Sequence, residues 1–163
     1  MALRLPKIPK IGVPTEEIDE NIRALLFQLN SFPYFKTEMS CAGHREGNRH
    51  SHGYILGIRD GDEELYAALI HSIQAWTAAY DKKAPTWFNI ESMGFGRGYV
   101  PGNEVFSIRL YPGKETELNQ LGEDSINLYY QNDDPQELTR RERAMKRSWK
   151  NLEGIVKLLR RQI

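Results

Sequence analysis

The chain has 163 residues, which suffices for one domain with a hydrophobic core and is short for two. Hydrophobic residues make up 40% of the sequence and charged residues 27%, a composition that excludes an intrinsically disordered protein. Lys plus Arg and Asp plus Glu number 22 each, so no overall charge attracts the protein to nucleic acid or to a membrane. The single cysteine cannot form an internal disulfide, and no apolar run approaches the roughly 20 residues of a membrane span. We therefore expect a cytoplasmic protein with no membrane partner.

The first residues favour an extended arm over 1–14, followed by a single domain over 15–163. Proline disfavours helix at its own position and just before it, and this arm contains Pro6, Pro9 and Pro14. Thr15 is a good helix N-cap. An apolar stripe with helical spacing follows it, which predicts a helix over about 15–31.

Two helix-strand-strand units follow one another in the sequence. In the first, the helix leads to strands predicted at Tyr34–Met39 and Gly53–Arg59. In the second, a helix over about 62–80 leads to strands at Thr86–Met93 and Glu104–Tyr111. This duplication predicts an α+β fold with a four-stranded sheet, antiparallel or mixed, and helices on one face.

The last helix, predicted over about 135–162, has the clearest period in the chain, and a short strand at Ile126–Tyr130 precedes it. Its apolar residues follow a heptad pattern: Leu138, Met145, Trp149, Leu152, Val156, Leu159 and Ile163. Such a stripe either packs on the sheet or the first helix, or forms a homodimer seam through residues 138–163. The segment 140–161 is also basic, with nine Lys and Arg against two acids, which suits nucleic-acid phosphates, an acidic protein surface or solvent.

Alternation along the strands predicts which side chains leave the core. Phe106, Ile108 and Leu110 should point inward. The helix-free face then carries Lys36, Glu38, Trp87, Asn89, Glu91 and Arg109. Such a face is a binding surface or is simply solvated, and Glu91 and Arg109 are placed to pair across the hairpin. We include Arg109 among the candidate ligand-binding residues.

The segment after the first strand gathers the only cysteine and three of the four histidines. Cys41, His44, His50 and His52 have the spacing Cys-x2-His-x5-His-x-His, and thiolate and imidazole are the donors that zinc prefers. Arg45, which lies inside the same loop with Arg49, weakens the case for a cation site.

Two other interpretations of this segment remain open. Cys41 is a nucleophile if His44 acts as its base, with Glu38 or Glu91 as the orienting residue. Alternatively, Cys41 is a small buried hydrophobe and His44 ends the strand. The glycine-rich segment 94–103 favours a hairpin loop, whose Arg97 would contact an anionic ligand if the loop folds over the site.

The motif around Cys41 resembles two groups of proteins. Thr37, Ser40, Cys41, Gly43 and His44 match a strand-ending Thr-x-x-Ser-Cys-x-Gly-His motif of small uncharacterised bacterial and phage proteins, as do Gly53 and Tyr54 in the following strand. More distantly, the segment resembles the wybutosine-synthesising tRNA methyltransferase family, whose strand ends in Ser-Ser-Cys-Ser-Gly-Arg. Here Ala42 and His44 replace the second serine and the arginine. This second resemblance bears on the fold more than on the reaction.

The first function hypothesis is a small zinc-dependent enzyme of the hydrolase type. Cys41, His44, His50 and His52 supply the candidate ligands, and Glu38 or Glu91 the base that acts on bound water. The alternatives are a nucleic-acid-associated protein of RNA modification, which uses the sheet face and the basic helix, and a non-enzymatic phage or mobile-element protein. The sequence identifies no small-molecule substrate.

Overall fold

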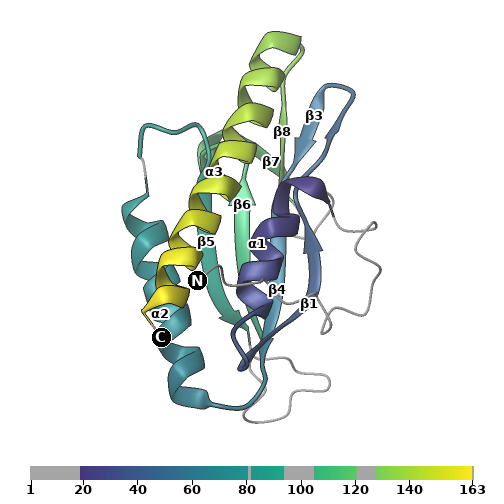
Figure 1. The fold of residues 1–163 in the computed structure, drawn as a ribbon. Helices are drawn as coiled ribbons and strands as arrows, with labels where there is room; N and C mark the ends of the chain where they lie inside the picture. The colour runs from purple at the N-terminus through teal and green to yellow at the C-terminus, as the bar shows by residue number, and fades with distance from the viewer. Residues whose placement is uncertain (1–18, 81, 94–104, 121–127, 163) are drawn as a thin grey trace.

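The computed structural model of the chain describes residues 19–80, 82–93, 105–120 and 128–162. These residues form three α-helices packed on a four-stranded sheet, with a second, smaller sheet at one end (Figure 1). The predicted arm at 1–14 and the glycine-rich segment with Arg97 lie outside the described residues.

The main sheet is built from the two predicted helix-strand-strand units, so the predicted fold class is confirmed. Its strand order is β1-β4-β6-β5, and each neighbouring pair is antiparallel. The elements are α1 (Glu20–Asn30), β1 (Phe35–Cys41), β4 (Gly53–Arg59), α2 (Glu63–Ala79), β5 (Trp87–Met93) and β6 (Val105–Tyr111).

The helices cover one face of this sheet, and the side chains predicted to point inward from β6 are buried there, although Ser107, Arg109 and Tyr111 on the other face are buried as well. Phe106, Ile108 and Leu110 are fully buried in the core. Register corrects one prediction on the other face, because Asn89 and not Glu91 lies directly opposite Arg109. Glu91 lies opposite Ser107 instead.

The second sheet was largely absent from the prediction. It consists of β2 (Arg45–Glu46), β3 (Arg49–Ser51), β7 (Leu118–Gln120) and β8 (Leu128–Gln131), in the order β2-β3-β8-β7. Only β8 has a predicted counterpart. Strands of two to four residues are too short to show an alternating pattern, and the central pair β3–β8 joins segments far apart in the chain.

The long helix α3 (Pro135–Arg161) crosses the helical layer and reaches the second sheet (Figure 1). Asp134 caps it by accepting a hydrogen bond from the Gln136 backbone N–H at 3.0 Å. Its predicted stripe is buried within the chain through Leu138, Met145, Trp149, Leu152 and Val156. A dimer through this helix would therefore have to use its other faces.

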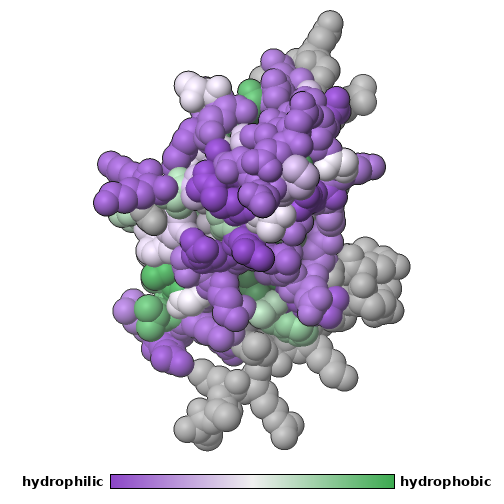
Figure 2. Space-filling view, turned by 90° about the horizontal axis from the view of Figure 1, so that it is seen from above, coloured by the Kyte–Doolittle hydropathy of each residue, from purple (hydrophilic) through white to green (hydrophobic). Residues whose placement is uncertain are grey.

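Viewed from the end where α3 begins, the surface is mostly hydrophilic, with scattered hydrophobic residues (Figure 2). Within the described part of the chain, no helix combines the length and the apolar character that crossing a membrane requires.

Candidate metal centre

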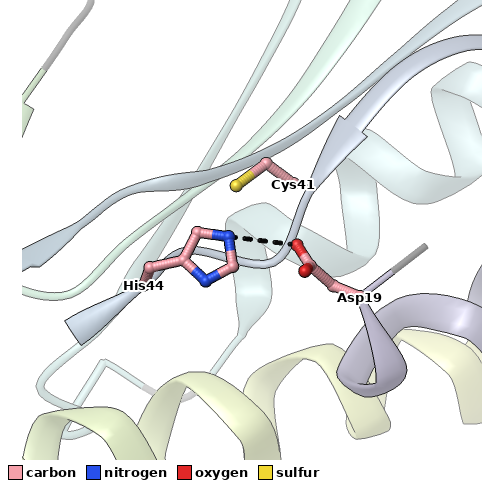
Figure 3. Close-up of side chains that lie close together, drawn as sticks. All are labelled: Asp19, Cys41 and His44. Atoms are coloured by element: carbon pink, nitrogen blue, oxygen red, sulfur yellow. Dashed lines mark ion pairs between the residues drawn. The ribbon is translucent and has the colours of Figure 1, made fainter. Parts of the chain in front are cut away.

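Asp19, Cys41 and His44 bring three potential metal ligands together at the end of the main sheet (Figure 3). One ligand atom from each residue lies within 4.8 Å of the other two. Cys41 ends β1, His44 follows in the turn toward β2, and Asp19 directly precedes α1. A carboxylate, a thiol and an imidazole thus converge from two separate segments of the chain.

The backbone N–H and C=O of Ala42 fix the position of Cys41 relative to Asp19. Its N–H donates to Asp19 Oδ2 at 2.8 Å, and its carbonyl accepts from Trp149 Nε1 at 3.0 Å. Trp149 is buried in the apolar face of α3, so the core itself holds this turn in place. The site is consequently anchored to both α1 and α3.

Two glycines allow the turn to pack closely against its neighbours. Gly43 has a φ of 90°, where a side chain is strained, and a Cβ there would lie 2.8 Å from the Ser51 carbonyl oxygen. A Cβ on Gly53 would lie 2.6 Å from the Ala42 carbonyl oxygen. Ser51 then fixes His44 twice, since its hydroxyl accepts from the His44 N–H and its own N–H donates to the His44 carbonyl, each at 2.9 Å.

Asp19 occupies the N-cap position of α1 without capping the helix. Its side chain makes no cap hydrogen bond, although aspartate is among the best capping residues. The carboxylate instead accepts from the Ala42 N–H and lies 3.4 Å from His44 Nε2. This side chain is therefore used for the turn and the site rather than for the helix.

Electrostatics in the metal-free cluster favour the neutral thiol of Cys41. Burial raises its pKa, and the negative charge of Asp19 and its hydrogen bond with the thiol raise it further; a hydrogen bond from the Gly43 backbone N–H acts in the opposite direction. A cysteine nucleophile requires the thiolate. A cation bound between the three side chains would instead lower the pKa of Cys41, because it would attract both the Cys41 thiolate and the Asp19 carboxylate.

A polar pocket of about 280 Å³ adjoins the cluster and contains His50. His44 and Glu142 also line it. His50 is 2% exposed, and its Nδ1 lies 2.8 Å from the Ser51 carbonyl oxygen, which can only accept, so Nδ1 carries the proton. Burial lowers the pKa of His50 and favours this neutral form, whose Nε2 is left as an acceptor.

The structure separates the four histidine and cysteine ligands predicted from the sequence. Cys41 and His44 belong to the convergent group, whereas His50 and His52 lie outside it. The His52 ring stacks on Tyr111 with centroids 5.6 Å apart and contacts Tyr54 at 5.8 Å. Of the predicted ligand set, the convergent group therefore contains Cys41 and His44, and Asp19 joins them.

The predicted acidic bases are not part of this group either. Glu38 is exposed and lies 3.9 Å from the Lys36 ammonium. Glu91 is on β5, which β4 and β6 separate from β1, and it accepts a hydrogen bond from Asn89 at 3.1 Å. Arg109 is buried on the helix-free face of β6, 6% exposed.

The arginines that weakened the case for a cation are engaged elsewhere. Arg45 donates to the Thr139 hydroxyl at 2.8 Å and to the Pro135 carbonyl at 3.4 Å, both at the beginning of α3. The Arg49 guanidinium lies over the Tyr129 ring, 4.7 Å from its centroid. Both guanidinium groups are thereby held by partners of their own.

Asp19 was not predicted from the sequence as a site residue, because the predicted helix began at Thr15 and placed it inside the first turn. The usable signal was an aspartate three positions before Ile22, the first buried residue of α1, since aspartate is typical of an N-cap. Nothing in the sequence relates that position to Cys41, since the contact arises from tertiary structure.

Comparison of the chain with protein-family models, curated protein sequences and solved structures finds no match in any of the three. The two resemblances noted from the motif around Cys41 therefore remain expectations. Function has to be argued from the site alone.

Proposed function

We propose that Asp19, Cys41 and His44 bind a single zinc ion and that the protein is a zinc-dependent enzyme of the hydrolase type. The observation that carries the proposal is the convergence of three different zinc-ligating groups within 4.8 Å. Three protein ligands with one open position are typical of catalytic zinc sites, whereas structural sites use four.

The chemistry of the donor set fits zinc. Thiolate, imidazole and carboxylate are its usual ligands, and the two anions would balance the charge of the ion. The raised pKa of Cys41 argues against the competing interpretation, a Cys–His nucleophile, because it disfavours the reactive thiolate. Zinc in such a site polarises a substrate oxygen and lowers the pKa of bound water.

The chain supplies the other groups that hydrolysis requires. His50 and Glu142 line the pocket next to His44. The tautomer of His50 leaves Nε2 able to accept a proton from a water in this pocket. We assign the role of base to His50 in place of the predicted Glu38 or Glu91. Asp19 and the Ala42 peptide orient the turn that carries His44.

Elemental analysis of the purified protein, followed by zinc titration of the chelator-treated protein, tests the proposal. We expect one zinc per chain in the wild type and none in the double variant Cys41→Ala, His44→Ala. Asp19→Asn should weaken zinc binding about 10-fold or more, because it removes an anionic ligand and keeps the size of the side chain.

His52→Phe is the matched control, because it removes a histidine of the same segment and keeps a ring to stack on Tyr111. Zinc content should be unchanged in this variant. A folded wild type without zinc, or equal zinc loss in the control and in the double variant, would contradict the proposal.

A further inference from the structure

The outer face of α3 carries a row of basic side chains that we call the basic ridge. It consists of four exposed residues: Arg143, Lys146, Arg147 and Lys150. Their spacing of three, four and seven positions places them on one side of a helix. They point away from the apolar stripe that is buried in the core.

The charge of the basic ridge is not neutralised by other described residues. None of its four members has an ion pair or a hydrogen bond with the described part of the chain, whereas other cations of the same helix are paired. Arg140 and Arg141 contact Glu137, and Lys157 lies 3.8 Å from Glu153. Four positive charges that no described residue pairs with, along about 10 Å of helix, suit a ligand with repeated negative charges.

The basic ridge leads directly to the proposed metal centre. Lys146 lines the pocket that contains His44 and His50. His44 also lines a second pocket, of about 440 Å³, on the side of the smaller sheet. The two pockets therefore share His44, and Lys146 of the basic ridge lines the first of them.

The second pocket contains an aromatic residue with an arginine over it. Arg49 and Tyr129 line this pocket together with Ser51, and the Arg49 guanidinium lies 4.7 Å from the centre of the Tyr129 ring. Aromatic rings and guanidinium planes are the groups on which unpaired nucleic-acid bases stack.

We propose that this continuous surface binds a single-stranded nucleic acid. Its phosphates contact the basic ridge, one base stacks in the Arg49–Tyr129 pocket, and the strand between them passes over His44. A duplex keeps its base faces stacked inside and cannot use Tyr129. The basic ridge has no exposed aromatic or aliphatic residue between its cations, so it lacks the apolar centre that a protein partner would need.

Acidic side chains also line the surface proposed for the nucleic acid, and they limit where its phosphates can lie. Glu142 lines the first pocket and Glu46 the second. We expect phosphates over the basic ridge and bases or sugars over these carboxylates. The idea that the nucleic acid is also the substrate of the enzyme rests on the proposed function. Its binding to this surface does not depend on that function.

Fluorescence anisotropy with a labelled oligonucleotide of about 12 nucleotides measures the binding. Each phosphate contact to a single strand contributes roughly 0.7 to the slope of log K against log salt concentration. The double variant Arg143→Gln, Arg147→Gln should reduce this slope by about 1.4 and weaken binding about tenfold at roughly 50 mM salt.

The matched control is the double variant Lys82→Gln, Arg161→Gln, which removes two exposed charges outside the basic ridge. It should leave the slope unchanged. Tyr129→Leu, which keeps an apolar side chain in β8, should weaken single-strand binding about tenfold by removing the stacked ring. Duplex of the same sequence should bind more weakly than the single strand and be insensitive to Tyr129→Leu.

Three results would overturn the inference. One is the absence of oligonucleotide binding by the folded wild type at low salt. The others are the same salt slope for the ridge and control double variants, and binding of poly-glutamate as tight as that of the oligonucleotide. Zinc chelation and the single variant Cys41→Ala, whose side chain lines neither pocket, separate this inference from the proposed function. We expect both to abolish zinc content and preserve oligonucleotide binding. A wild type that binds the oligonucleotide but holds no zinc would refute the metal centre alone.

Discussion

Two polar clusters flank α3, and they differ in how far their hydrogen-bonding groups are satisfied. The cluster around Arg141 is closed, because its guanidinium donates to Glu117, to Glu137 and to the carbonyls of Pro85 and Pro112. The same group lies over the Tyr130 ring, 4.3 Å from its centroid. Only 6% of the Arg141 side chain is exposed.

The cluster of Asp19, Cys41 and His44 is open by comparison. The His44 side chain is 61% exposed, and its Nε2 lies 3.4 Å from a single carboxylate oxygen. A polar group whose partners all lie within the protein stabilises the fold, whereas one with unused lone pairs beside a pocket is available to a ligand. The difference predicts that changes in the first cluster affect stability and changes in the second affect binding.

The largest effect should follow from breaking the closed cluster. Arg141→Met keeps the length of the side chain but removes the donor to Glu117 and to the carbonyls of Pro85 and Pro112, while Glu137 keeps its hydrogen bonds from Arg140. We expect a loss of about 3 kcal/mol in the free energy of unfolding. Urea denaturation measures it. Arg143→Met is the control, because Arg143 is exposed and has no described partner, and its effect should stay within about 0.5 kcal/mol. Equal losses in the two variants would mean that the cluster contributes nothing.

The open cluster should stabilise the fold only when a metal is bound. Zinc at about 100 times its Kd should stabilise the wild type by about 2.7 kcal/mol, since a ligand of the folded state shifts the unfolding equilibrium. Cys41→Ser should remove most of this gain and change the metal-free stability little. The gain should shrink as pH falls, because protons compete with the metal for the thiol and the imidazole. Denaturation curves with and without zinc provide the measurement, and equal zinc stabilisation of Cys41→Ser would count against the site.

A smaller effect is expected from the turn that holds the open cluster together. Gly43→Ala should cost about 1–2 kcal/mol from its positive φ, and more from the contact of the new Cβ with the Ser51 carbonyl. Gly47→Ala is the control: Gly47 has a φ of 60°, but nothing lies within 4 Å of a Cβ there. The excess loss at Gly43 measures the packing of the turn. Zinc affinity should fall only in Gly43→Ala, because only that turn positions His44.

The two regions also differ in how well the sequence predicts them. The strands of the main sheet are seven residues long, which is enough for an alternating pattern to show. β4 was accordingly predicted with its observed bounds, Gly53–Arg59, and the inward residues of β6 were correct. Heptad spacing likewise identified the buried stripe of α3. These patterns are local, because each follows from a single helix or strand that faces the core.

The open cluster depends on contacts that no local pattern encodes. Cys41 and His44 could be chosen because they are only three positions apart in the sequence and carry reactive groups. Asp19 lies beside them through tertiary structure: its carboxylate accepts from the Ala42 N–H, and Trp149, more than 100 positions further along the chain, donates to the Ala42 carbonyl. His50 and His52 were grouped with them by proximity, yet the short strand β3 and the Tyr111 ring direct them elsewhere.

The smallest expected effect is a pH dependence of the unfolding free energy that only the closed cluster produces. Hydrogen bonds from Arg140 and Arg141 lower the pKa of Glu137 from 4.5 to about 2, and Arg141 also lowers that of Glu117. A lowered carboxyl pKa stabilises the folded state above the ordinary value, and this contribution disappears as pH falls from about 5 toward 2. Because Glu137 is partly exposed and solvent screens the pair, we expect only about 1 kcal/mol. Glu137→Gln should flatten the decline in unfolding free energy of the metal-free protein over this range. Glu115→Gln should not, because the Glu115 side chain is exposed and has no described partner. If both variants keep the wild-type decline, the acid sensitivity of the fold arises outside the closed cluster.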